Sequence, residues 1–216
     1  MSTILVLLVL KETKRMDKEH KIRKRILDYA QQQFATIGYS KVSTAQFASD
    51  LKMSKSTFYK YFSSKEELLF AVIDDFYHSF EQEIQSIIND DSLEITEKVQ
   101  SFILSVRKRF RHLHVSVVED FRRAVPEAYA HLEERRRSLI TGTLIGLFEQ
   151  GARDGFFRSD IPPMIIANVL IQAMQHLEHP EVIGELPYSF ADMFQQVFSI
   201  VMEGSLSEEG RKRFRS

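Results

Sequence analysis

The stretch TAQFASDLKMSKSTFYKYFSSK, from Thr44 to Lys65, determines how the whole chain is interpreted. Its spacing predicts two short helices, joined by a tight turn at residues 52–53 and followed at once by a third helix. Thr44 and Ser54 are expected to cap the first two helices, because a side-chain hydroxyl can accept a hydrogen bond from the free N–H groups of a first turn. Two short helices joined by a turn of this length form a helix-turn-helix.

The second of these helices has the size of a helix that enters the major groove of DNA. Its polar side chains are hydroxyls, a phenol and two amines, which are groups that bond to phosphates or to base edges. They are Lys55, Ser56, Thr57, Tyr59 and Lys60. A plain helical hairpin with a solvated outer face would show the same spacing, so the spacing alone leaves both interpretations open.

Together with the helix before it, this stretch resembles the DNA-binding domain of the TetR family of bacterial transcriptional repressors over about residues 20 to 70. Many positions agree in one fixed register. They are Ile26, Leu27, Ala30, Phe34, Gly38, Tyr39, Ser43, Thr44, Phe47, Ala48, the run 53–62 and the run 65–68. The chain departs from the family where Lys52 and Ser56 replace frequent glycines. A left-handed conformation at Lys52 would cost about 1 kcal/mol.

The resemblance implies an all-α fold with two parts, an N-terminal three-helix helix-turn-helix domain and a C-terminal helical bundle for ligand binding and dimerisation. The expected domains are 17–64 for DNA binding, 65–204 for the bundle with 65–89 as the connecting helix, and 205–216 as a polar tail. The resemblance also implies a set of DNA-binding side chains. Thr44, Tyr59 and Lys65 are expected to hold phosphates, Ser56, Lys60 and Lys55 are the best candidates for base edges, and Ser54 and Thr57 complete the set.

The composition excludes several classes of site. The chain has 216 residues and no cysteine, which excludes disulfides, thiolate zinc sites and a cysteine nucleophile, and which suits the reducing cytoplasm. Only 8 glycines and 5 prolines are present, which favours long helices over sheets.

The net charge of −1 conceals an asymmetry. Residues 1–65 contain 13 Lys/Arg and 5 Asp/Glu, a net charge of +8, and residues 66–216 contain 16 and 25, a net charge of −9. A basic head on an acidic body is expected of a DNA-binding domain joined to a domain that does not touch DNA.

The N-terminal residues MSTILVLLVL are mostly apolar. The run from Ile4 to Leu10 is far shorter than the roughly 20 residues that span a bilayer, and the positive charges follow it instead of preceding it. We therefore expect residues 1–16 to be a disordered or non-native extension, with Met16 as a candidate natural start. A membrane tether is the alternative.

Apolar residues that recur at three- and four-residue steps predict helices along the rest of the chain. Ser64 and Glu67 have the spacing of a capping box at the start of the connecting helix. Pro126 and Pro163 are expected to open two later helices, where the missing proline N–H does no harm. The expected helices are 18–37, 65–89, 93–113, 115–124, 126–150, 163–177 and 188–203.

The helices 163–177 and 188–203 carry apolar residues beyond one stripe, so each must be buried on more than one side. By resemblance they form a four-helix interface with a second subunit, and burial within one chain is the alternative. The expected interface residues are Ile166, Leu170, Met174, Phe190, Phe194, Val197 and Val201.

The sequence carries no signature of catalysis. It has no phosphate-binding glycine loop, no nucleophile elbow and no His-Glu-x-x-His motif. His176 and His179 have the spacing of a metal pair, but no further ligand lies near them in the sequence. We therefore expect no enzyme activity, no catalytic residue, no metal site and no cofactor.

The body is expected to hold an apolar ligand pocket, because such pockets are what helical bundles offer. Each candidate lining residue could equally be an ordinary core residue. The candidates are Tyr77, Phe80, Phe102, Phe110, His114, Phe121 and Tyr129.

These observations predict a sequence-specific regulator of transcription, expected to be a homodimeric repressor that a small molecule of unknown identity releases from a palindromic DNA operator. Two alternatives remain open at this point. One is a DNA-binding protein whose body meets a protein partner, and the other is an enzyme built on a helical bundle.

Overall fold

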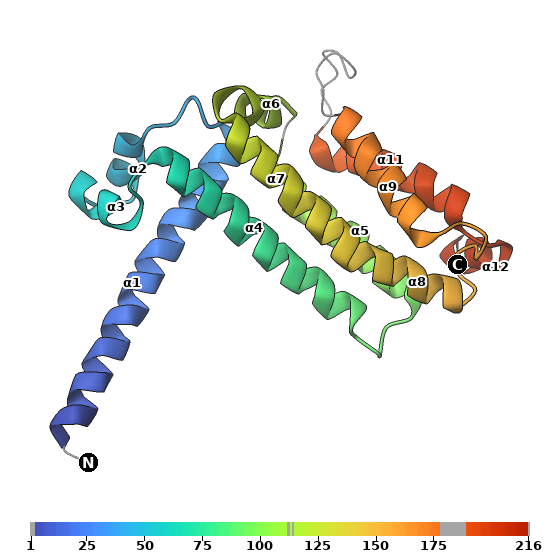
Figure 1. The fold of residues 1–216 in the computed structure, drawn as a ribbon, viewed down its shortest axis with the longest axis horizontal. Coiled ribbons are helices and arrows are strands. Elements are labelled where there is room, and N and C mark those ends of the chain that lie inside the picture. Colours follow the sequence, from blue (N-terminus) through green and yellow to red (C-terminus); the bar gives the residue numbers. More distant parts are fainter. Residues whose placement is uncertain (1–2, 112, 114, 178–188, 216) are drawn as a thin grey trace.

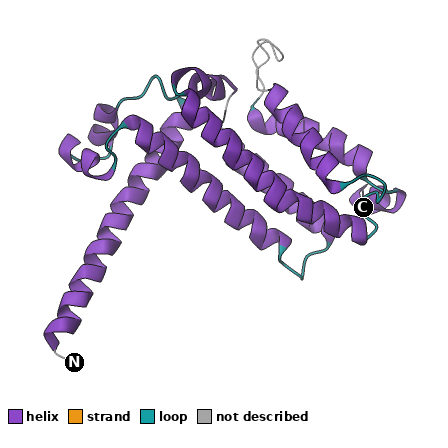
Figure 2. Ribbon diagram, in the orientation of Figure 1, coloured by secondary structure: helices purple, strands orange, loops and turns teal. Residues whose placement is uncertain are grey.

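The computed structural model describes residues 3–111, 113, 115–177 and 189–215. Within these ranges the helices are joined by loops and turns, and the only other regular structure is isolated bridge residues, which confirms the predicted all-α fold class. Figure 2 shows the helices joined by short loops. None of the helices in these ranges is long and apolar enough to cross a membrane.

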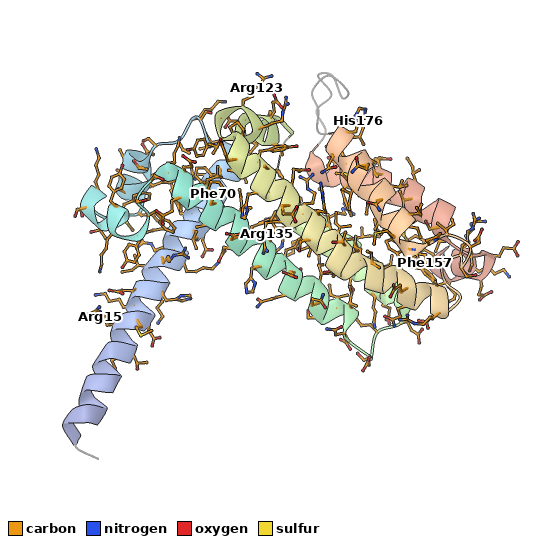
Figure 3. The ribbon with its side chains drawn as sticks, in the orientation of Figure 1. Arg15, Phe70, Arg123, Arg135, Phe157 and His176 are labelled. Atoms are coloured by element: carbon orange, nitrogen blue, oxygen red, sulfur yellow. The ribbon has the colours of Figure 1, made fainter. Side chains whose placement is uncertain are left out.

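Three helices form the N-terminal head, namely α1 (Thr3–Thr36), α2 (Thr44–Asp50) and α3 (Lys55–Tyr61). The helices α2 and α3 lie beside the C-terminal half of α1, whereas its N-terminal half projects away from the other helices (Figure 1). Arg15 lies on this projecting part (Figure 3). The arrangement confirms the predicted helix-turn-helix head.

The helix α1 begins earlier than the sequence analysis expected. The segment 1–16 was predicted to be a disordered or non-native extension. The structure continues the helix back to Thr3, so it does not show a disordered segment there. The reason is local, because residues 3–36 contain no glycine or proline and many leucines, lysines, arginines and glutamines, which are good helix formers. At about 1.5 Å per residue, α1 is about 50 Å long.

The other helices form the body. The helices α4, α5, α7 and α8 run side by side, and α9 and α11 form a second pair against them (Figure 1). The elements are α4 (Lys65–Ile88), α5 (Ile95–Phe110), α6 (Val115–Ala124), α7 (Pro126–Leu139), η1 (Ile140–Leu144), α8 (Ile145–Arg153), α9 (Pro163–Leu177), α11 (Phe190–Ser205) and α12 (Glu208–Arg215).

The helix α4 belongs to both parts, because it packs against α1 at its start and against α5 and α7 further along. The Ser64 hydroxyl caps it as predicted, by accepting a hydrogen bond from the Glu67 backbone N–H at 2.9 Å. The Glu67 carboxylate accepts from the backbone N–H of Ser63 at 2.7 Å instead of from Ser64, so the reciprocal half of the capping box is shifted by one residue.

The predicted helix 126–150 is interrupted by a π-helical turn, η1, between α7 and α8. Within η1 the Thr141 hydroxyl donates a hydrogen bond to the Arg137 carbonyl at 2.9 Å, and Gly142 follows directly. A threonine that bonds back to the preceding turn and a glycine both weaken the regular α-helical ladder. The π turn is therefore placed where the sequence supports an α-helix least.

The predicted polar tail, 205–216, contains the helix α12, which packs on the body. Phe214 lies 6.3 Å from Phe156, measured between ring centroids, and the Ser207 N–H donates to the Phe156 carbonyl at 3.0 Å. A β-carbon at Gly210 would lie only 2.0 Å from that carbonyl oxygen, so glycine is the residue that permits this close approach.

Candidate functional site

The helix-turn-helix is fixed by local capping. The Ser54 hydroxyl accepts from the Thr57 N–H at 3.0 Å and caps α3, as predicted. The cap of α2 differs from the prediction, because Ser43 and not Thr44 accepts from the Gln46 N–H, at 3.2 Å. Thr44 is then the first helical residue, and its hydroxyl is available for a bond outside the helix.

The turn between α2 and α3 contains a strained residue. Lys52 has φ +53°, the left-handed conformation that the sequence analysis considered at a cost of about 1 kcal/mol. The turn is closed by hydrogen bonds from the Lys52 N–H to the Ser49 carbonyl at 3.0 Å and from the Met53 N–H to the Ala48 carbonyl at 2.9 Å. The chain therefore keeps the turn geometry without the glycine usual in the family that it resembles.

Aromatic packing orients α3. Phe58 is the buried residue of this helix and its ring lies 6.3 Å from that of Phe47 on α2, which in turn contacts Phe34 on α1 at 5.5 Å. With Phe58 turned inward, the hydroxyls and lysines of α3 are turned outward. Lys55, Ser56, Tyr59 and Lys60 are exposed, as is the cap Ser54, and Thr57 is half-buried.

The structure joins two predicted phosphate ligands. The Thr44 Oγ1 and the Tyr59 hydroxyl lie 3.0 Å apart, and Tyr59 keeps 48% of its surface exposed. Lys60 also has a neighbour, because its Nζ lies 3.2 Å from a carboxylate oxygen of Glu19 on α1. A phosphate that binds Lys60 must compete with this exposed ion pair, which is worth little in water.

Lys65 has a structural role that the sequence did not indicate. Its Nζ donates to the carbonyls of Tyr39 and Val42, both at 3.0 Å, and lies 3.9 Å from the centre of the Tyr39 ring. Burial lowers the pKa of its amine. Two of its three N–H donors thus hold the loop between α1 and α2, and the predicted phosphate contact is limited to the third.

Two polar contacts outside the predicted site join the head to the body. The carboxylate of Asp120 on α6 accepts the Ser40 N–H at 2.9 Å, across 80 residues of sequence. The preceding Gly38 has φ +98°, and a β-carbon there would lie 2.9 Å from that carboxylate. Lys24 of α1 and Asp75 of α4 form a second link at 2.8 Å. Nothing in the local sequence marks Asp120, because its partner is set by tertiary packing.

A cavity of about 390 Å³ lies where the head meets the body. Its wall comes from α1, α4, α5, α6 and α7. Of the predicted pocket residues, Tyr77, Phe110 and Phe121 line it. The sequence analysis missed the wall contributed by the head, which includes Phe34 and Ala35, because it placed the pocket in the body alone.

The other predicted pocket residues lie elsewhere. Phe80 and Phe102 line a second pocket of about 50 Å³ within the body, where Tyr77 and Phe110 also contribute. Tyr129 lines neither of these two cavities. His114 lies outside the described residues.

Both arginines at the larger cavity have carboxylate partners. Arg109 lies 2.6 Å from Glu83, and Arg136 lies 3.1 Å from Glu133. Burial alone would raise the pKa of Glu83, but the hydrogen bond from Arg109 holds that pKa below its usual value. The two arginine charges at the cavity are therefore compensated within the protein.

The helices α9 and α11 pack on each other and on the body. Five of the predicted interface residues are at most 8% exposed in the single chain, as the alternative interpretation proposed, and Val201 is half-buried. These five are Ile166, Leu170, Met174, Phe194 and Val197. The side chain of Phe190 is not described. The outer face of the pair instead exposes Ile165, Val169 and Ile200, at 53%, 51% and 73%.

Comparison with known proteins agrees with the helix-turn-helix geometry of the head. Residues 26–72 match the family model described as "Bacterial regulatory proteins, tetR family". The HTH-type transcriptional regulator YvaF of Bacillus subtilis is 22% identical over 164 residues, which are 75% of this chain and 84% of that protein.

Solved structures share the fold. The fatty acid degradation regulator FadR from Bacillus halodurans has a TM-score of 0.64 at 19% identity, covering 84% of this chain and 95% of that one. A SmeT–triclosan complex has a TM-score of 0.60 at 16% identity, covering 86% and 92%. With its match to the family model and the helix-turn-helix geometry described above, the head is a DNA-binding domain of the TetR family, and the chain shares the fold of solved transcriptional regulators.

Proposed function

We propose that this protein is a homodimeric, cytoplasmic repressor that binds a palindromic operator and leaves it when a small molecule enters the cavity between head and body. The observation that carries the proposal is the outward face of α3, where exposed hydroxyls and lysines stand on a helix held in place by Phe58. Such a face can enter a major groove without any rearrangement of the head.

Each exposed group of the head has a role in this proposal. Ser56, Lys55 and Lys60 contact base edges, because they lie on the outward side of α3 and carry donors that reach guanine or adenine. The paired hydroxyls of Thr44 and Tyr59 bind one phosphate together. The Lys65 amine contributes its third donor near the same backbone.

The cavity supports a small-molecule effector more than a protein partner. A closed, phenylalanine-filled body would favour a protein partner, whereas a cavity of about 390 Å³ falls within the range of about 300–1,000 Å³ that small-molecule sites occupy. SmeT, whose fold this chain shares, is known as a complex with triclosan, a small molecule.

The homodimer is supported by the exposed face of α9 and α11. Ile165 and Val169 are one helical turn apart on α9, and their side chains are half exposed in the single chain. A second copy that covers this face would bury them. The proposed interface is therefore this outer stripe and not the buried residues that the sequence analysis selected.

A DNA titration tests the proposal. Labelled duplexes from the region upstream of the protein's own gene should bind more tightly than unrelated duplexes of equal length. Lys55→Ala should bind the preferred duplex about tenfold more weakly, because it removes a cation from the face of α3. One specific base contact is worth about 1–3 kcal/mol, and a tenfold loss lies within this range.

Lys212→Ala is the matched control, because it removes the same charge from an exposed position on α12 in the body. It should bind DNA like the wild type. Equal loss in both variants would show that only overall charge matters, and no loss in Lys55→Ala would remove α3 from the DNA interface.

A further inference from the structure

We infer that the cavity binds an uncharged, ring-bearing apolar molecule, and that its occupancy reaches the DNA-binding head through the hydrogen bond between Asp120 and Ser40. This inference rests on the proposed function and names the effector class and the route of regulation.

The first support is the position of the cavity. One wall belongs to α1 of the head, with Gln31, Phe34 and Ala35, and the facing wall belongs to the body. A bound molecule therefore touches the DNA-binding head directly. A shift of α1 is passed on to α2 and α3, because Phe34 packs on Phe47 at 5.5 Å and the Tyr29 hydroxyl bonds to Asp50 at 2.5 Å.

The second support is the chemistry of the wall. Five aromatic rings face the cavity, from Phe34, Phe76, Tyr77, Phe110 and Phe121. Aromatic walls favour a ligand with rings of its own, since offset and edge-to-face contacts add about 0.5–1.5 kcal/mol each beyond simple burial.

The third support is the charge balance. Arg109 and Arg136 at the wall are each within 3.1 Å of a glutamate, so a charged ligand would have to break one of these pairs or remain uncompensated. Either event is costly in a partly buried site. Asp28 at the wall is exposed and shares Lys24 with Asp75, at 2.9 and 2.8 Å, so its charge is screened by water and by this lysine. The site therefore selects against ions.

The fourth support is the link between the cavity wall and the head. Phe121 and Val118 of α6 line the cavity, and Asp120, the neighbour of Phe121, accepts the Ser40 N–H. Phe121 also contacts Phe34 edge-on, with ring centroids 6.5 Å apart. A ligand that enters between these rings separates α6 from α1 and draws the Asp120 carboxylate away from Ser40.

The effect is allosteric only if the ligand prefers the separated state over the joined one. The structure describes the joined state, in which Asp120 holds Ser40 and the head has a fixed orientation. The ligand weakens DNA binding by favouring the separated state, in which the head is no longer held by α6.

Two dyes with the same rings test the ligand class in the absence of DNA. N-phenylnaphthylamine is uncharged, and anilinonaphthalene sulfonate carries the same aromatic rings with an anionic group. The full-length protein should bind the uncharged dye at least about tenfold more tightly than the anionic dye. Ala35→Phe, which fills the cavity from the head side, should lose the uncharged dye, and Ala130→Phe on the exposed side of α7 should keep it.

Hydrogen exchange at the Ser40 amide tests the route. The uncharged dye should speed exchange at Ser40 at least about fivefold, as expected when one hydrogen bond is lost. In Asp120→Ala the Ser40 amide should already exchange fast without dye, and adding the dye should change its exchange rate little. Asp120→Asn keeps an acceptor oxygen and should respond to the dye like the wild type.

The inference is overturned if the two dyes bind equally, if Ala35→Phe still binds the uncharged dye, or if the bound dye leaves exchange at Ser40 unchanged. None of these readouts involves DNA. A negative result in the dye or exchange experiments therefore does not bear on the proposed DNA binding. A negative DNA titration likewise does not affect the interpretation of the dye and exchange experiments.

Discussion

Phe34→Ala is expected to lower the free energy of unfolding by about 3–5 kcal/mol, the usual cost of removing a buried phenylalanine. Phe34 is 1% exposed and contacts aromatic rings of three different elements, namely Tyr39 in the loop after α1, Phe47 of α2 and Phe121 of α6. Its loss opens a void where the head is attached to the body.

Chemical denaturation of the purified protein measures this effect. Phe34→Leu keeps most of the apolar volume and should lose less than about 1.5 kcal/mol, so the pair separates loss of volume from loss of the aromatic ring. A Phe34→Ala protein as stable as the wild type would show that the joint between head and body does not depend on this ring.

Val169→Glu is expected to convert the proposed dimer into a monomer and to reduce operator affinity by about 100-fold or more, because two linked heads gain this much from binding together. Val169 is 51% exposed in the single chain, so a glutamate there should not disturb the fold of the subunit. In the dimer the same carboxylate would be buried without a partner, which strongly disfavours association.

Light scattering and DNA titration of the same samples test this prediction. Leu104→Glu is the control, because Leu104 is 61% exposed on α5 and the change adds the same charge to another apolar surface position. It should remain a dimer and bind DNA normally. A Val169→Glu protein that stays dimeric would place the subunit interface on another face.

The head could be predicted largely from the sequence because its determinants are local. The cap at Ser54 and the left-handed turn at Lys52 have partners three residues away, and Phe58 packs on Phe47 of the preceding helix. The misplaced cap on Thr44 shows the limit of such predictions, since Ser43 beside it carries an equivalent hydroxyl and takes the role.

The candidate effector site was less predictable because it is made by tertiary contacts. The bond between Asp120 and Ser40 spans 80 residues, and no spacing rule could pair them. Phe34 matches the head motif, yet it also lines the cavity. Periodicity showed that α9 and α11 are apolar on more than one side, but it could not tell which apolar residues face the chain's own core.

Photo-crosslinking from α3 tests the central claim, that this helix enters the groove of DNA, most directly. A benzophenone amino acid at Ser56, an exposed residue of α3, should crosslink to a bound duplex from the protein's own upstream region, and one at Lys212 on α12 should not. A protein that binds the duplex but crosslinks only from Lys212, or from neither position, would contradict the account.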